Sequence, residues 1–218
     1  MDADALKREA ARLAAGLVED GMTVGLGTGS TVAHLLPALA SRSLSIQCVA
    51  TSPQTEEAAQ TLGITVVPFG TIDHFDITID GADQITPEGW LVKGGGAAHT
   101  REKIVAAAAS RFVVIADDSK LVPALHAPVP LELMGYGLSA TVRHLESLGG
   151  RVTMRQVPTS PDGGVIADYH DDIPDPGELA VWLSSVPGLV AHGLFEPQLV
   201  HDVIVANTGG TEHRRLHD

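Results

Sequence analysis

Acidic and basic side chains gather between Asp80 and Lys103. This stretch holds the two aspartates Asp80 and Asp83, the lysine Lys93 followed by three glycines, and Glu102 near the start of an expected helix. Carboxylates can transfer protons and an ammonium group can stabilise a developing anion. The stretch is therefore a candidate acid–base site.

The few lysines of the chain indicate where an anionic substrate could be held. The formal net charge is -13, and the lysines are Lys7, Lys93, Lys103 and Lys120. A chain this acidic repels anions unless cations are placed locally. Lys120 follows an apolar run in the segment ADDSK, so we expect it to hold part of such a substrate.

The segment Gly25–Thr31, GLGTGST, offers backbone N–H groups, hydroxyls and the start of a helix, which together bind phosphate well. Its glycine spacing matches neither the dinucleotide fingerprint nor the Walker loop. The alternative is a tight turn in which Ser30 or Thr31 caps the helix.

In DGAD, the small residues Gly81 and Ala82 leave room for a ligand to approach the backbone. The aspartates could instead cap the next element or bind a divalent metal ion. We expect no metal, because no third carboxylate or histidine stands at suitable spacing and Lys93 would compete for the same carboxylates.

The segment Lys93–Gly96 is costly to order as a triple glycine, so close approach of a ligand explains it better than chance. Its N–H groups could receive oxyanions. Glu102 lies in the first turn of a helix that His99 or Thr100 could cap, where a negative charge also favours the helix dipole.

Composition excludes several classes of function. The chain has 218 residues, of which 44% are hydrophobic, and its basic residues form no cluster, which argues against nucleic acid or an anionic membrane as partner. The single cysteine, Cys48, excludes internal disulfides and is expected to be buried. No apolar signal core or membrane-spanning stretch is present, so we expect a cytoplasmic protein.

Alternating strand and helix patterns predict an α/β fold: a mostly parallel, Rossmann-like sheet flanked by helices, with a second, smaller α+β lobe. Expected helices cover 4–18, 31–39, 53–63 and about 100–109. Expected strands cover 22–26, 45–50, 64–69, 75–80, 90–93, 111–117 and 202–207. The segments GTGS, DGAD, KGGG and DDSK each follow an apolar run, so we expect them at one sheet edge.

After residue 120 the composition changes, and a proline-rich segment follows. Beyond it we expect helices near 139–148 and 176–186 and strands near 151–157, 164–170 and 189–195. We therefore expect a catalytic α/β domain over 1–127 plus 199–218 and a smaller α+β domain over 128–198. The charged end, EHRRLHD, is expected to be a solvated tail in which His213 and His217 are exposed.

The blocks GLGTGST, TSPQT, DGADQI, KGGGAAHTREK and IADDSK occur in this order over the first 120 residues. Together they resemble the ribose-5-phosphate isomerase family of the A type. The later segments GGVIADYH and PGLVAHGLF resemble its smaller lobe more loosely. The resemblance implies an aldose–ketose isomerase of the non-oxidative pentose phosphate pathway, which interconverts D-ribose 5-phosphate and D-ribulose 5-phosphate through an enediolate. It also implies a homodimer or homotetramer without metal or cofactor.

The resemblance assigns roles to residues. Glu102 corresponds to the general base, and Asp80, Asp83 and Lys93 correspond to its companions around the reacting carbons. The expected substrate contacts are Thr28, Gly29, Ser30, Thr31, Gly81, Ala82, Gly94, Gly95 and Gly96, with Lys120 and Lys7 as cations on the phosphate side.

The sequence departs from the usual pattern of this family at two places. His99 replaces a frequent leucine, and SPDGG at 160–164 replaces a more usual TDNGN turn. The second lies in the smaller lobe and bears on its geometry or assembly rather than on chemistry.

Two other classes of function stay open. One is an amino-sugar-phosphate isomerase/deaminase or a lactonase on a similar sheet. The other is a sugar-phosphate-binding sensor module without chemistry, which normally carries a helix-turn-helix, and nothing basic precedes Leu6 here. A sensor would not exchange the C2 proton of the sugar with solvent.

Overall fold

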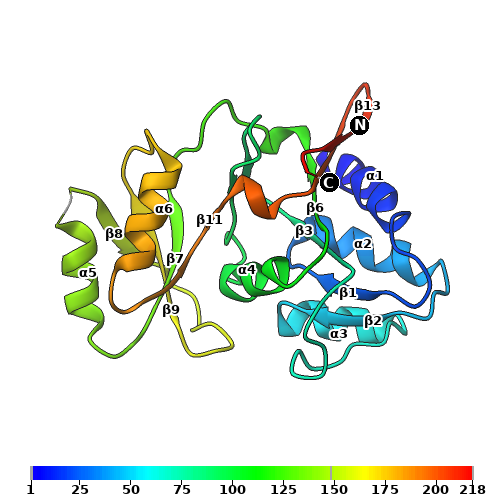
Figure 1. Ribbon diagram of the computed structural model, residues 1–218, viewed down its shortest axis with the longest axis horizontal. Coiled ribbons are helices and arrows are strands. Elements are labelled where there is room, and N and C mark those ends of the chain that lie inside the picture. Colours follow the sequence, from blue (N-terminus) through cyan, green and yellow to red (C-terminus); the bar gives the residue numbers. More distant parts are fainter. Residues whose placement is uncertain (1, 148, 218) are drawn as a thin grey trace. The chain divides into compact units, whose positions relative to one another are not determined.

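The computed structural model describes residues 2–147 and 149–217, and the chain forms two compact units (Figure 1). Unit 1 contains the residues up to Ala82, Arg101–Lys120 and those from Pro197 onward. Unit 2 contains Asp83–Thr100 and Leu121–Glu196. The division differs from the expected domains mainly in residues 83–100, which cluster with the smaller unit.

Unit 1 is built on a six-stranded sheet in the order β13-β12-β6-β3-β1-β2. All neighbouring strands are parallel except the antiparallel pair β12 and β13. The strands are β1 (Thr23–Leu26), β2 (Gln47–Ala50), β3 (Ile77–Gly81), β6 (Phe112–Asp117), β12 (Asp202–Asn207) and β13 (Gly210–Arg215). The prediction of a mostly parallel sheet, including the return of segment 202–207 to it, is confirmed.

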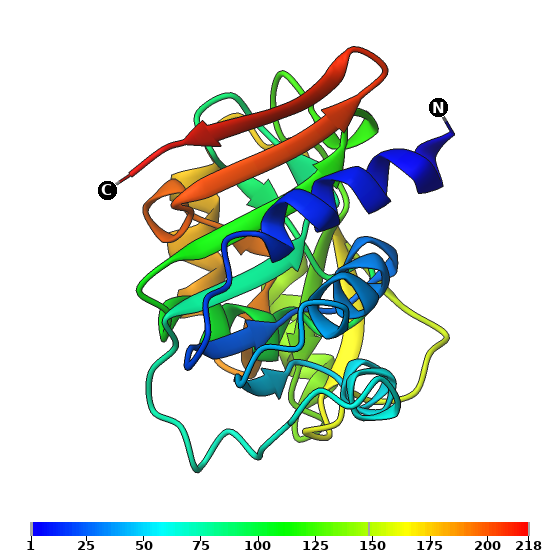
Figure 2. The ribbon, with the colours of Figure 1, turned by 90° about the vertical axis from the view of Figure 1, so that its right-hand side faces the viewer.

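Helices cover both faces of this sheet. They are α1 (Ala3–Ala15), α2 (Ser30–Ala40), α3 (Pro53–Thr61) and α4 (His99–Ala107), with the short 3-10 helices η1 (Asp118–Lys120) and η2 (Pro197–Leu199). Figure 2 shows α1 lying across the sheet beside β6 and β12. The buried side chains of Val24, Leu26, Ile77 and Ile79 pack with α1 and α2 in one core.

Successive strand residues point to opposite faces, so Gly25 on β1 and Thr78 on β3 face away from α1 and α2. They face α4 instead. Thr78 donates a hydrogen bond to the carbonyl of Val105 on α4 at 3.3 Å. A Cβ on Gly25 would lie 2.5 Å from the Val105 side chain. The bare backbone at Gly25 therefore lets α4 approach the sheet closely.

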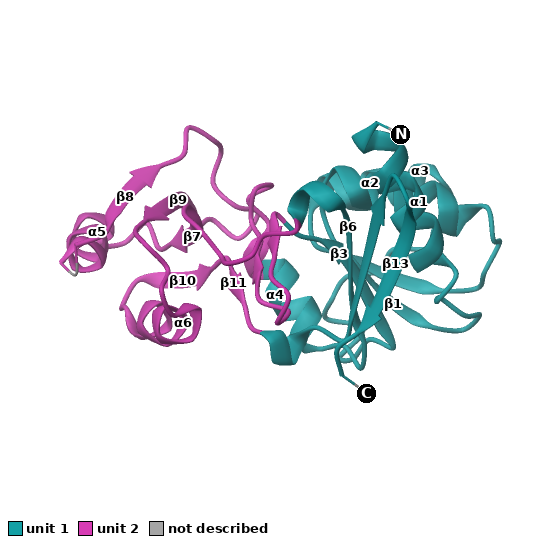
Figure 3. Cartoon of the chain, turned by 90° about the horizontal axis from the view of Figure 1, so that it is seen from above, with its two compact units in different colours: residues 1–82, 101–120, 197–218 teal, residues 83–100, 121–196 magenta. Residues whose placement is uncertain are grey.

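Unit 2, magenta in Figure 3, contains two antiparallel sheets. The first has the order β10-β7-β9-β8 and is formed by β7 (Val129–Leu133), β8 (Arg151–Met154), β9 (Val165–His170) and β10 (Leu189–His192). The second has the order β11-β5-β4 and is formed by β4 (Gln84–Ile85), β5 (Leu91–Val92) and β11 (Leu194–Phe195). Helices α5 (Leu138–Glu146) and α6 (Pro176–Ser185) contribute to the core of this unit with Leu131, Tyr169 and Leu183.

The structure differs from the prediction in three segments. Segment 64–69, expected as a strand, forms only an isolated bridge between Val66 and Cys48. The proline-rich segment contains strand β7, which was not expected. The end of the chain contains a strand, because β13 pairs along its length with β12 and His213 contacts Asp202 at 2.6 Å, although His213 and His217 are exposed as expected.

The expected meeting of four loops at one sheet edge holds only in part. GTGS follows β1, whereas DGA and DDSK begin within the last residues of β3 and β6; these strands are parallel neighbours in the large sheet. KGGG follows β5, which belongs to the three-stranded sheet of unit 2. The segment KGGG therefore extends from a different sheet than the other three segments. None of the helices in the described residues is long and apolar enough to cross a membrane.

Candidate active site

Asp80 is the penultimate residue of strand β3, and backbone N–H groups hold its carboxylate. Its Oδ1 accepts hydrogen bonds from the amide of Thr28 at 3.1 Å and from its neighbour Gly81 at 2.7 Å. The side chain is only 1% exposed. A Cβ on Gly27 would lie 1.9 Å from the Asp80 carboxyl carbon, so glycine is required for this carboxylate to fit beside the loop.

The hydroxyl groups of Thr51 and Thr55 contact the GTGS loop. Thr28 Oγ1 lies 2.8 Å from Thr51 Oγ1, and Thr55 donates to the carbonyl of Gly27 at 3.0 Å. Gly29 is the N-cap of α2, with φ +119° and no side-chain cap. The alternative in which Ser30 or Thr31 caps the helix is therefore wrong, and the left-handed φ explains why this position is glycine.

A cation lies beside this loop. Lys7 on α1 donates from Nζ to Ser30 Oγ at 3.0 Å. The start of α2 and the Lys7 ammonium group therefore reach the same hydroxyl, and both carry positive potential that favours a phosphate.

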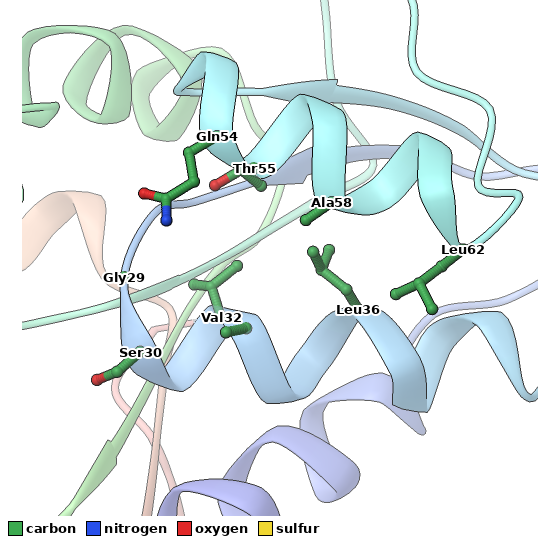
Figure 4. Close-up of a pocket in the computed structure, with 9 residues that line it drawn as sticks. Gly29, Ser30, Val32, Leu36, Gln54, Thr55, Ala58 and Leu62 are labelled. Atoms are coloured by element: carbon green, nitrogen blue, oxygen red, sulfur yellow. The ribbon is translucent and has the colours of Figure 1, made fainter.

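A pocket of about 380 Å³ opens beside the loop, between α2 and α3. Figure 4 shows Val32 and Leu36 of α2 pointing toward Ala58 and Leu62. Its lining residues are Gly29, Ser30, Val32, Ala33, Leu36, Gln54, Thr55, Ala58 and Leu62. The pocket is largely apolar along the helices and polar at the end near Ser30.

Glu102 lies in the first turn of α4 and is 4% exposed. It stands three residues before Val105, so both occupy the same side of the helix. Asp80 stands two residues after Thr78, so both point to the same face of β3. Because Thr78 bonds to Val105, Glu102 and Asp80 belong to facing sides of two elements that are tied together within unit 1.

At the end of β6, Asp117 starts the turn that carries Lys120. Its Oδ1 accepts from the amide of Ser119 at 3.1 Å and from the Ser119 hydroxyl. Asp117 is buried, whereas Lys120, at the end of η1, is half-buried. Strands β6 and β3 are parallel, so Lys120 lies at the same sheet edge as Asp80 and the GTGS loop.

In unit 2, Lys93 is 2% exposed and follows β5. Its amide donates to the carbonyl of Gly193 at 2.8 Å, and its Nζ lies 5.5 Å from the centroid of the Phe195 ring. A cation over an aromatic face is attracted by the ring quadrupole. The first contact holds the backbone at Lys93, and the second holds the ammonium end of its side chain.

The glycines after Lys93 are required by close packing inside unit 2. Gly94 has φ +107°, and a Cβ there would lie 2.7 Å from His99 Nδ1 and 2.8 Å from Pro130 Cβ. The Gly95 amide donates to Asp83 Oδ2 at 2.7 Å. This N–H group, expected to receive an oxyanion, thus binds an aspartate of the protein itself.

The start of α4 is anchored to a buried glutamate that sequence analysis missed. Thr100 donates to Glu132 on β7, which also accepts a hydrogen bond from Ser160 of the SPDGG turn. A Cβ on Gly164 would lie 2.1 Å from Glu132 Oε1. In the SPDGG turn, which replaces TDNGN, Ser160 donates a hydrogen bond to Glu132. Gly164 leaves the space that the Glu132 carboxylate occupies.

Arg155, just after β8, was also missed and contacts the glycine loop. Its only signal in the sequence is the period of two in RVTMRQV, which places Arg151, Thr153 and Arg155 on one face of the strand. Within residues 2–147 and 149–217, no three His, Cys, Asp or Glu side chains gather so that they could hold a metal ion.

Comparisons with known proteins agree on one family. The family described as ribose 5-phosphate isomerase A (phosphoriboisomerase A) matches residues 47–210. Ribose-5-phosphate isomerase A of Bradyrhizobium diazoefficiens is 44% identical over 89% of this chain and 89% of its own.

Solved structures of ribose 5-phosphate isomerases superpose on nearly the whole chain. Ribose 5-phosphate isomerase A from Neisseria gonorrhoeae superposes with a TM-score of 0.94 at 32% identity, covering 100% of this chain and 99% of that one. A D-ribose-5-phosphate isomerase in complex with phospho-erythronic acid gives 0.93 at 32% identity, covering 99% and 100%. The chain belongs to the ribose 5-phosphate isomerase A family.

Proposed function

We propose that this protein interconverts D-ribose 5-phosphate and D-ribulose 5-phosphate, with Glu102 moving a proton between C2 and C1. The observation that carries this proposal is the buried carboxylate of Glu102, on a helix that is hydrogen-bonded to the strand containing Asp80. Family membership supplies the substrate.

In the proposed reaction, the Glu102 carboxylate removes the proton from C2 of the open-chain aldose. The C2–H electrons form the C1–C2 double bond, and the electrons of the C1 carbonyl move onto O1 to give the enediolate. Glu102 then returns the proton to C1 while the proton of the C2 hydroxyl is transferred to O1, so that C2 becomes the ketone and C1 carries the hydroxyl. A positioned base of this kind typically contributes about 10²- to 10⁴-fold in rate.

Lys93 is proposed to stabilise the negative charge that develops on the enediolate oxygens. Losing one such donor commonly costs about 3 kcal/mol. Asp80 and Asp83 are proposed to carry hydroxyl protons during ring opening and transfer. Gly81, Ala82, Gly94 and Gly96 remain proposed substrate contacts, where small residues allow close approach.

The phosphate is proposed to bind at the start of α2. The supporting geometry is the Gly29 N-cap, Ser30 with its Lys7 partner, and Thr31 in the first turn. Lys120 adds a second cation at the same sheet edge. An anion at this position gains from the helix dipole and from both ammonium groups.

Location in the cytoplasm and assembly as a homodimer or homotetramer are proposed from the family resemblance and the sequence. Light scattering during size-exclusion chromatography distinguishes the two assemblies. The comparisons do not favour the alternatives of a sensor module or an amino-sugar-phosphate deaminase.

The function is tested by incubating the pure protein with ribose 5-phosphate in D₂O with a chelator and following the sugar by NMR. We expect ribulose 5-phosphate to form and carbon-bound deuterium to enter the sugar. Binding without either change would support a sensor. Ammonia released from an amino-sugar phosphate, without pentose isomerisation, would support a deaminase.

A further inference from the structure

Arg155 makes a forked contact inside unit 2. Its Nε and one terminal nitrogen bind the two carboxylate oxygens of Asp168 on β9 at 2.8 and 2.6 Å. Its other terminal nitrogen donates to the carbonyl of Gly94 at 2.7 Å and to that of Gly95 at 3.3 Å. Asp168 therefore fixes the guanidinium plane, which in turn holds two carbonyls of the glycine loop.

The two carbonyls belong to peptide groups whose N–H groups face the other way. The Gly94 carbonyl shares its peptide with the Gly95 amide, which donates to Asp83 Oδ2 at 2.7 Å. A continuous series of hydrogen bonds thus runs from Asp168 through Arg155 and one peptide group to Asp83. Each bond in such a series strengthens its neighbours.

The charges in this series have a favourable order. The cationic guanidinium binds the negative end of the peptide dipole, and the Asp83 carboxylate binds its positive end. The side chains of Arg155 and Asp168 are 18% and 16% exposed, so solvent screens their interaction only in part. The peptide between Gly94 and Gly95 is therefore held in one orientation from both ends.

The space around this peptide admits no side chain on either glycine. A Cβ on Gly94 would meet His99 and Pro130, and a Cβ on Gly95 would lie 2.7 Å from Asp83 Oδ1. With no side chains of their own, these glycines cannot fix the loop by packing. The orientation of the loop must come from its hydrogen bonds, and Arg155 supplies two of them.

We propose that Arg155 is a positioning residue for catalysis, acting through the Gly94–Gly95 peptide to orient the Asp83 carboxylate. Asp168 holds Arg155 in the required plane. This inference rests on the proposed role of Asp83 in the isomerase reaction. Lysine cannot replace arginine here, because a single ammonium group cannot bind a carboxylate in two places and two carbonyls at once.

The test is a double-mutant cycle on kcat with the variants R155K, D83A and R155K/D83A. We expect R155K alone to lower kcat by about 10- to 100-fold with little change in KM, because small misplacements of a reacting group cost this much. In the D83A background, R155K should change kcat by less than about twofold, because its target is gone. R151K is the matched control, since Arg151 is an exposed arginine at the start of β8, the strand that Arg155 follows.

Equal effects of R155K in both backgrounds would overturn the proposal, and so would an unchanged kcat in R155K. If R155K does not fold, D168N replaces it in the same cycle, with the same expectation and the same contradicting results. Wild-type protein in the same assay separates the two claims. An inactive wild type would refute the proposed function, whereas an active wild type with additive variants would refute only the role of Arg155.

Discussion

At the scale of single residues, the partners of each buried carboxylate define what it can do. Asp80 is bound by two backbone amides, Glu132 by two hydroxyls, and Asp202 by Arg111 and His213. The first belongs to the candidate site, whereas the others hold elements in place. Burial also raises the pKa of the Cys48 thiol to about 12, so it is not a nucleophile at neutral pH.

Asp202 is expected to stabilise the fold in a pH-dependent way. Burial favours its neutral form, but the hydrogen bonds and charges of Arg111 and His213 outweigh burial and hold its pKa below the usual 3.8. The stabilisation is therefore complete above about pH 4 and is lost as the pH falls through the lowered pKa. D202N should lower the free energy of unfolding by roughly 3 kcal/mol at pH 7.

Urea unfolding at several pH values measures this effect. The difference between wild type and D202N should shrink as the pH falls below about 4. D4N is the control, because Asp4 also pairs with an arginine and a histidine but is exposed, and exposed pairs contribute little. A D202N protein as stable as the wild type at pH 7 would contradict the assignment.

At the scale of elements, the docking of α4 on the large sheet places Glu102. The contact depends on Gly25, whose missing side chain leaves room for Val105, and on the hydrogen bond from Thr78. Within unit 2, Thr100 in the first turn of the same helix donates a hydrogen bond to Glu132. Separate contacts therefore bind the first turn of α4 and its middle.

G25A should disturb this docking. The added Cβ would lie 2.2 Å from Thr78 Oγ1 and 2.5 Å from Val105 Cγ1, so α4 must shift or Thr78 must rotate. We expect a loss of about 1–3 kcal/mol in the free energy of unfolding and a lower kcat.

Thermal unfolding and steady-state kinetics check this prediction. G70A serves as control, because a Cβ on Gly70 meets nothing within 4 Å and should leave both quantities unchanged. A G25A protein with wild-type kcat would show that the position of α4 does not matter for turnover.

Some elements were not predictable from local pattern. Strand β7 contains Pro130 and follows a proline-rich run, so tertiary pairing with β9 and β10 overrides its poor strand propensity. Strand β13 is a charged edge strand, which resembles a loose tail in sequence. Segment 64–69 has strand composition, yet its pairing with Cys48 is limited to an isolated bridge at Val66.

At the scale of the whole molecule, hydrophobic periodicity was enough to predict the mostly parallel sheet and the smaller lobe, because long buried runs leave few other arrangements. The blocks around Asp80, Lys93 and Glu102 pointed to the family that the comparisons show. The assignment of 83–100 to a unit, and the contacts of Arg155 and Glu132, were not predictable. They depend on pairing between segments far apart in the chain.

The central claim is that Glu102 carries the proton, and the variant E102Q tests it most directly. Its kcat for ketose formation and its Kd for ribose 5-phosphate, by calorimetry, should be compared with those of the wild type. E56Q is the control, since Glu56 is an exposed glutamate in the first turn of α3. We expect E102Q to lose at least about 10²-fold in kcat with Kd changed by no more than a few-fold. Turnover near the wild-type value in E102Q would contradict the account.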